Sequence, residues 1–159
     1  NNLLLGRRSG TSGAPSGAVT TASHVLCLGD DNISNFYCAD TSISSSDRRD
    51  KADIEDFSAG LDFINQMRPV TYRWDKRSWY EDGVPNGSNK KDKLNIGFIS
   101  QEVQELEQAL GFSTNKDDEL ICNTNEDDSA SGLKYERLVP ILVNAIKELS
   151  AKVEALENA

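Results

Sequence analysis

A heptad pattern in the C-terminal stretch constrains the fold more than any other feature of this sequence. Apolar residues recur there at alternating steps of four and three, which puts them on one side of a helix as in coiled coils. They are Tyr135, Val139, Leu142, Ile146, Leu149, Val153 and Leu156. Pro140 has no amide proton to donate, so we expect the regular helix to begin close to it. The sequence predicts a C-terminal coiled-coil-like helix.

The heptad pattern does not determine what this helix packs against. Heptad position a is taken by Val139, Ile146 and Val153. This register puts Lys152 at g and Glu157 at the following e, a pair that can bridge parallel helices. β-Branched residues at a with Leu at d are the preference of parallel dimers. One amphipathic helix packed on its own domain is the default for a seam of about three heptads.

Length and charge narrow the classes of protein. A chain of 159 residues holds one ordinary core plus an appendage. The net charge of -9 repels a phosphate backbone and an anionic membrane surface, so we expect neither nucleic acid nor membrane as a partner. No apolar run approaches the roughly 20 residues that span a bilayer. Because the chain opens with Asn, we expect it to be part of a longer protein.

Composition changes near residue 46. Residues 1–45 hold 5 of the 11 glycines and few charges, and charge rises sharply afterwards. Residues 24–28 and 33–37 are predicted to be short strands between turns. This first segment has too few large apolar residues for a core, so we expect it to be β-rich and to pack on neighbouring chains or on an upstream part of the protein. The predicted domains are residues 1–45 and 46–159.

The second domain is predicted to be α+β and predominantly helical with short strands. A helix is expected from Ile54 to the stop at Pro69, then strands at 70–74 and 94–99 on either side of an exposed loop at 79–93. Ser100 is predicted to cap a helix that Gly111 ends. Residues 120–122 are expected to be an edge strand.

Cysteine and histidine give no sign of a metal site. Cys27, Cys38 and Cys122 are odd in number and lack C-x-x-C spacing, which argues against a disulfide framework and a zinc site. We expect them to be mostly buried apolar residues in a reducing compartment. His24 lies in the turn-rich segment and is expected to be structural. No metal and no cofactor is predicted.

Three separated motifs carry a family resemblance. They are Ser46-Asp47-x-Arg49-x-Lys51, then Gly97-Phe98-Ile99-Ser100-Gln101-Glu102-Val103, then Tyr135-Glu136-Arg137-Leu138-Val139-Pro140 with Ala145-Ile146-Lys147-Glu148-Leu149. In this order they resemble the intramolecular chaperone domain of endosialidase tailspikes and tail fibres, peptidase family S74. The resemblance covers roughly residues 46 to 159. Ser100 departs from it, since the family more often has Ala before Gln101.

The resemblance implies a self-cleaving chaperone. Such a domain trimerises, assists folding of the upstream fibre and releases itself by cutting before the motif serine, here between Ser45 and Ser46. Residues 1–45 would then be the β-rich C-terminal end of the fibre or spike. The implied nucleophile is Ser46 and the implied base is Lys51, which must be neutral to accept a proton. Five residues separate them, about 140° on an ideal helix, so we expect Ser46 in a turn outside any helix near Lys51.

Other motif residues have open roles. Asp47 and Arg49 match the pattern, and shaping the turn is at least as plausible for them as catalysis. Arg137 matches a family arginine that either holds a carboxylate across an interface or solvates the start of the helix. Both readings stay open.

Two other functions compete with cleavage. One is a permanent tip that trimerises the fibre without cutting, and the other is a receptor-binding tip, suggested by Trp79 and Tyr80 in the exposed loop. For these aromatic residues we favour packing of the loop. The same domain occurs in membrane-tethered cellular proteins. The viral reading places the chain in the host cytoplasm during assembly, and in the virion tail fibre if it is retained.

Overall fold

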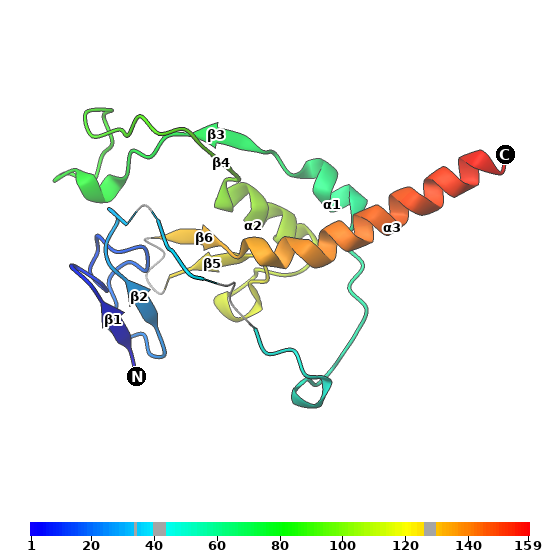
Figure 1. Cartoon of the computed structure of the whole chain (residues 1–159), viewed down its shortest axis with the longest axis horizontal. Helices are drawn as coiled ribbons and strands as arrows, with labels where there is room; N and C mark the ends of the chain where they lie inside the picture. Colours follow the sequence, from blue (N-terminus) through cyan, green and yellow to red (C-terminus); the bar gives the residue numbers. More distant parts are fainter. Residues whose placement is uncertain (34, 40–43, 126–129) are drawn as a thin grey trace.

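A long C-terminal helix lies against two shorter ones in the computed structural model, which describes residues 1–33, 35–39, 44–125 and 130–159 (Figure 1). The α-helices are α1 (Leu61–Gln66), α2 (Ser100–Ala109) and α3 (Leu138–Glu157). The strands are β1 (Leu3–Leu5), β2 (Leu26–Leu28), β3 (Val70–Tyr72), β4 (Asn95–Gly97), β5 (Cys122–Thr124) and β6 (Ser131–Leu133). Single 3-10 turns lie at Arg48–Asp50, Arg77–Trp79, Lys116–Asp118 and Tyr135–Arg137. The mixed content of helix and short strand is as predicted.

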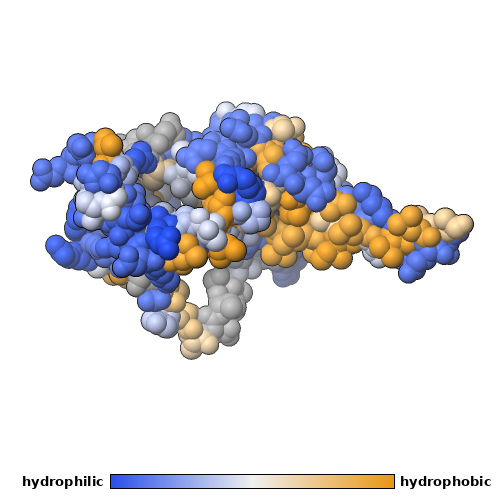
Figure 2. Space-filling view, turned by 90° about the horizontal axis from the view of Figure 1, so that it is seen from above, coloured by the Kyte–Doolittle hydropathy of each residue, from blue (hydrophilic) through white to orange (hydrophobic). Residues whose placement is uncertain are grey.

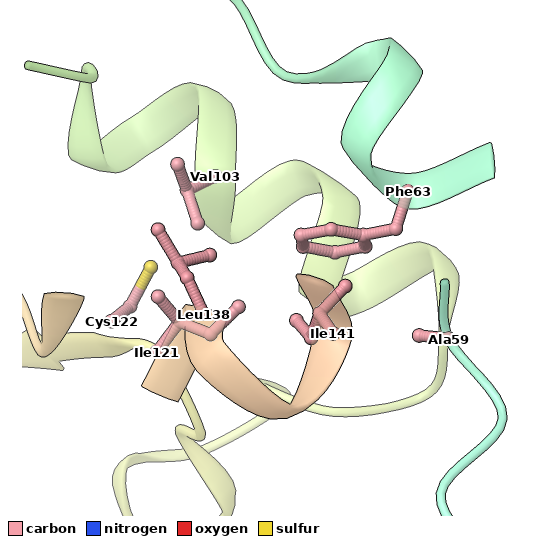
Figure 3. Close-up of a cluster of buried hydrophobic side chains, with 7 residues drawn as sticks. All are labelled: Ala59, Phe63, Val103, Ile121, Cys122, Leu138 and Ile141. Atoms are coloured by element: carbon pink, nitrogen blue, oxygen red, sulfur yellow. The ribbon is translucent and has the colours of Figure 1, made fainter. Parts of the chain in front are cut away.

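The hydrophobic core lies where α1, α2, β5 and the first half of α3 meet. Figure 3 shows its buried side chains converging, with Phe63 of α1 and Val103 of α2 pointing toward α3. The cluster consists of Ala59, Phe63, Val103, Ile121, Cys122, Leu138 and Ile141. Full burial of a large apolar side chain stabilises a fold by about 1.5–3 kcal/mol, so these few residues hold the domain together.

Helix α3 has two apolar faces with different surroundings. Leu138, Ile141 and Ala145 are buried against the rest of the chain. The heptad residues lie on the adjacent side of the helix and are exposed, from 44% for Leu142 to 79% for Leu156. The helix therefore packs on its own domain with one face and leaves the predicted seam uncovered with the other. Its start at Leu138 agrees with the predicted start near Pro140.

The strands pair two by two among the described residues. β3 and β4 are antiparallel, with Val70 opposite Gly97, and the exposed loop lies between them as predicted. β5 pairs antiparallel with β6, with Cys122 opposite Leu133. The predicted edge strand at 120–122 is thus displaced toward Thr124, and its partner was not predicted.

The prediction of a helix from Ile54 is wrong in its first part, because α1 begins only at Leu61. Side chains of α3 bind the preceding backbone in an extended form. Asn144 Nδ2 donates to the carbonyl oxygens of Phe57 and Ala59, at 2.6 and 3.1 Å. Those carbonyls cannot then accept helical hydrogen bonds, and the apolar spacing that continues before Leu61 does not compensate.

The predicted cap at Ser100 is also wrong. Ile99 occupies the N-cap position of α2, and no side chain caps it. The Ser100 hydroxyl donates instead to Oε1 of Gln101 at 3.1 Å, since Ser100 is already inside the helix. Gly111 ends the helix as predicted, with a φ of +86° that favours glycine.

The N-terminal segment differs from its prediction in three places. β2 is present, but it pairs in parallel with β1, which was not predicted. The described residues of 33–37 form no strand. Cys27 and Cys122 are buried, whereas Cys38 is exposed, so the prediction of buried cysteines is wrong for Cys38. Within the described ranges, no helix combines the length and the hydropathy needed to cross a bilayer.

Candidate cleavage site and association surface

Ser46 and Lys51 are brought together by a tight reversal of the chain. The Lys51 ammonium donates a hydrogen bond to the Ser46 hydroxyl, with 2.7 Å between Nζ and Oγ. The 3-10 turn Arg48–Asp50 lies between them, and the Lys51 amide closes it by donating to the carbonyl of Arg48 at 3.2 Å. Ser46 precedes this turn and Lys51 follows it, so neither is within an α-helix.

Asp47 and Arg49 build that reversal. The Asp47 carboxylate caps the turn by accepting from the Arg49 amide at 2.9 Å. The Arg49 guanidinium grips the same carboxylate, with 2.6 Å between Nη2 and Oδ2. The guanidinium, and after it the amide, lower the pKa of the Asp47 carboxyl below its usual value. Asp47 therefore stays charged at neutral pH and keeps the turn capped.

The turn projects from the body of the protein. Every residue from 44 to 58 is exposed, including Ser45 and Ser46 on either side of the expected cut. Figure 1 shows this arm as a loop that leaves the N-terminal segment, swings away from the helices and returns to α1. Ser46 and Lys51 are thus open to solvent in a single chain.

Asn144 and Glu148 of α3 fix the arm where it rejoins the body. Glu148 Oε2 accepts a hydrogen bond from the Leu61 amide at 3.3 Å. A Cβ at Gly60 would stand 2.0 Å from Glu148 Oε1, so a larger residue there would displace the Glu148 carboxylate. Glu148 belongs to the last of the separated sequence motifs, which therefore anchors the segment that carries the first.

The second and third motifs also meet. Tyr135 lies beside β4, where its hydroxyl accepts a hydrogen bond from the Phe98 amide at 3.2 Å. The Phe98 and Tyr135 rings lie 6.0 Å apart, tilted by 34°. The structure thus packs together motif residues that lie far apart in the sequence.

The comparison with known families agrees with this arrangement. Residues 46–112 match the family model of peptidase S74, described as the chaperone of endosialidase. This part of the chain resembles the endosialidase chaperone. The match begins at Ser46, where the composition changes and the reactive turn starts. No curated protein matches the chain.

The family match indicates the general function of this chain. The endosialidase-chaperone domain supports a chaperone role for this chain, and the family as a whole implies autoproteolytic peptidase activity. The match ends at residue 112, so α3 lies beyond it.

Arg137 stands at the start of α3. It ends the 3-10 turn Tyr135–Arg137 and occupies the N-cap position of the helix, and its side chain is exposed. Within the described residues, its side chain is not brought into contact with Ser46 or Lys51.

Glu107 is a buried charged residue within the family match that was not predicted from the sequence. Its side chain is 1% exposed and accepts three backbone hydrogen bonds, from the amides of Leu120, Ile121 and Cys122. It lies four residues after Val103, on the buried side of α2, and this helical spacing is the one signal that could have found it. Glu107 fixes β5 against α2.

The exposed heptad face of α3 forms the second candidate site of the chain. We call it the seam and define it as Val139, Leu142, Ile146, Leu149, Val153 and Leu156. Figure 2 shows apolar residues gathered along one side of α3 out to the C-terminus. Exposed apolar strips of this length mark association surfaces.

In the part of the chain that the structure describes, no group of three or more His, Cys, Asp and Glu side chains is placed to hold a metal ion.

Proposed function

We propose that this chain is the intramolecular chaperone of a viral tail fibre or tailspike, which trimerises and then cuts itself off between Ser45 and Ser46. The observation that carries the proposal is the 2.7 Å contact between Lys51 Nζ and Ser46 Oγ, at the first residue of the family match. At this distance an uncharged lysine could take the proton of the hydroxyl, as a base does for its nucleophile.

The proposed reaction is an acyl shift followed by hydrolysis. Neutral Lys51 takes the proton of the Ser46 hydroxyl as Oγ attacks the carbonyl carbon of Ser45. The Ser45–Ser46 peptide bond breaks, its nitrogen takes up that proton, and an ester joins Ser45 to Ser46 Oγ. Water hydrolyses the ester, which leaves a carboxylate on Ser45 and a free amine on Ser46. Because the acyl group departs with the upstream chain, each domain reacts once.

Lys51 acts on the serine of its own chain in this proposal, since the 3-10 turn already joins the two side chains. Lysine is a base only when uncharged, and burial favours the uncharged form. Ser46 and Lys51 are exposed in the single chain. We therefore assign their burial to neighbouring chains of the trimer, which would make cleavage depend on assembly.

The seam supports the trimer. Its residues are exposed although the neighbouring face of α3 is buried, which indicates that a surface outside the chain covers them. The family resemblance favours three copies over the two that the residues at a and d would suggest. The upstream fibre is the second partner, and assembly takes place in the host cytoplasm.

A tip that trimerises without cutting is the second candidate, and the exposure of Lys51 favours it. Receptor binding through the loop has less support. Trp79 and Tyr80 are half-buried, and the Tyr80 hydroxyl donates to Asp75 Oδ1 at 2.5 Å and accepts from the Asn89 amide at 2.9 Å. These aromatic residues pack the loop rather than face a ligand.

Intact-mass spectrometry of the purified chain tests the proposal. We expect a new N-terminus at Ser46, and an uncut chain after Ser46→Ala or Lys51→Gln. Ser45→Ala is the matched control and should still be cut, because only the carbonyl of residue 45 reacts. An assembled but uncut wild type would refute the peptidase and leave the non-cleaving tip.

A further inference from the structure

The carboxylate of Asp31 is held by a loop that lies beyond the Ser45–Ser46 bond. Lys76 Nζ lies 2.8 Å from Asp31 Oδ1, and the Ser78 hydroxyl donates to Oδ2 of the same carboxylate. The two charged side chains are 24% and 10% exposed, respectively, so the pair is largely removed from water. A cation and a hydroxyl of one domain thus bind both oxygens of an anion in the other.

The cation has an aromatic support. Lys76 Nζ lies 4.6 Å from the centre of the Trp74 ring and 6.0 Å from that of Trp79. Lys91 lies over Trp79 as well, at 4.7 Å. Ring faces attract a cation and shield it from solvent. Lys76 is therefore held in place to receive a carboxylate, a role that neither the cleavage chemistry nor the seam requires.

The anion is presented by the fold of the N-terminal segment. The Asp31 amide donates to the carbonyl of Gly13 at 2.8 Å, which ties the acidic turn to a part of the chain 18 residues earlier. The neighbouring Asp30 accepts from the Asn32 amide at 3.0 Å and shapes that turn. Asp31 reaches Lys76 in this position only when the segment before it has folded.

We propose that Asp31 and the pocket of Lys76, Ser78 and Trp74 form a lock that keeps the two products together after the peptide bond is cut. This inference rests on the proposed cleavage and adds a second, non-covalent step to release. The lock recognises an acidic turn on a folded fibre end. Cutting removes the covalent link, and the chaperone leaves only when the ion pair opens.

The strength of such a lock depends on how deeply the ion pair is buried and on how many copies of it the assembly carries. Removing one partner of a desolvated ion pair mainly speeds dissociation, because the remaining charge stays buried without its partner. A trimer carries three copies, and linked contacts hold far longer than one alone. We expect loss of either charge to shorten retention about tenfold or more.

The test separates retention from self-cleavage. A site-specific protease sequence is inserted between Ser44 and Ser45 in the full chain carrying Ser46→Ala, so that cutting does not depend on the native reaction. The cut protein is held by a tag after Ala159, and the retained fragment of residues 1–44 is measured over time. Buffers contain ~50 mM or ~1 M NaCl, which change the screening length from more than 10 Å to about 3 Å.

We expect the fragment to stay bound at low salt and to leave at high salt. Asp31→Asn and Lys76→Gln should each release it at low salt, from opposite sides of the contact. Asp53→Asn and Lys90→Gln make the same charge changes at exposed positions and should retain it. Circular dichroism confirms that the variants fold.

Two outcomes overturn the lock: immediate loss of the wild-type fragment at low salt, or equal retention in all four variants. The Ser46 protein without the inserted sequence reports on self-cleavage separately. If the Ser46 protein cuts itself but the fragment leaves the protease-cut protein at low salt, only the lock is refuted. If the fragment is retained but the Ser46 protein stays uncut, only the proposed peptidase is refuted.

Discussion

The hydroxyl of Tyr135 lies over Gly97, in the space that a side chain on residue 97 would need. A Cβ there would stand 2.5 Å from that hydroxyl and 3.4 Å from Cε1 of Tyr72. Tyr135 cannot simply turn away, because its hydroxyl accepts the hydrogen bond of the Phe98 amide. The pair joins the β-ribbon of β3 and β4 to the start of α3.

Gly97→Ala should therefore destabilise the domain. The methyl group pushes the Tyr135 hydroxyl off the Phe98 amide, and we expect the free energy of unfolding to fall by about 1–2 kcal/mol in urea titrations. Gly132→Ala is the matched control, since a Cβ at residue 132 meets no atom within 4 Å. Equal stability of the two variants would contradict the role given to Tyr135.

The Glu107 carboxylate should stabilise the fold more than any exposed acidic side chain on α2. Glu107→Gln keeps the shape but points an amide donor at one or more of the three backbone donors that converge on it. We expect a loss of about 2–4 kcal/mol in the free energy of unfolding. Glu105→Gln removes an exposed charge from the same helix and should change it by less than about 0.5 kcal/mol. If Glu107→Gln proves as stable as this control, the carboxylate does not anchor β5.

The seam should control association without controlling the fold. Ile146 is 65% exposed, so Ile146→Glu leaves the core untouched but puts a charge in the seam. We expect wild type to sediment at three times the 17.5 kDa chain mass and the variant at the mass of one chain, with unchanged helix content. Ala151→Glu adds the same charge on the other side of α3 and should stay assembled. An Ile146→Glu trimer would show that α3 is not the association helix.

The cysteines should differ in reactivity although none is paired among the described residues. Maleimide at pH 8 should modify exposed Cys38 within minutes and leave Cys122 unmodified until the chain unfolds. Burial, and after it the hydrogen bond and charge of Glu107, raise the pKa of the Cys122 thiol. Rapid native labelling of Cys122, read by peptide mass mapping, would show that β5 opens.

The raised pKa of the Cys122 thiol also predicts that the stability of the fold falls at alkaline pH. The folded state keeps the Cys122 proton at a pH where the unfolded chain releases it. Its contribution to stability is therefore fully present below the ordinary thiol pKa of about 8.5, and it is lost as pH rises above that value. Cys122→Ala should remove this part of the decline between pH 8.5 and 10, measured by urea unfolding.

The sequence predicted elements whose pattern is local. The heptad spacing located α3 and its exposed face, Gly111 located the end of α2, and the β-forming run after Pro69 located β3. Each of these signals lies within the element that it describes, so distant contacts do not alter it.

Errors arose where distant residues decide the local structure. Asn144 and Glu148 determine where α1 begins, more than 80 residues away in the chain, and no pattern near Ile54 records them. The partner of β5 and the burial of Glu107 likewise depend on tertiary contacts. The expected turn at Ser46 agrees with the structure, but its 2.7 Å contact with Lys51 depends on a 3-10 turn that the spacing alone does not specify.

The dependence of the core on α3 has a consequence for synthesis on the ribosome. Leu138 and Ile141 form one wall of that core, so the folding of residues 59–125 cannot finish until they have emerged. Premature termination anywhere before them yields a chain with neither a closed interior nor a seam. The position of a single helix thus couples the folding of the domain to the completion of its translation.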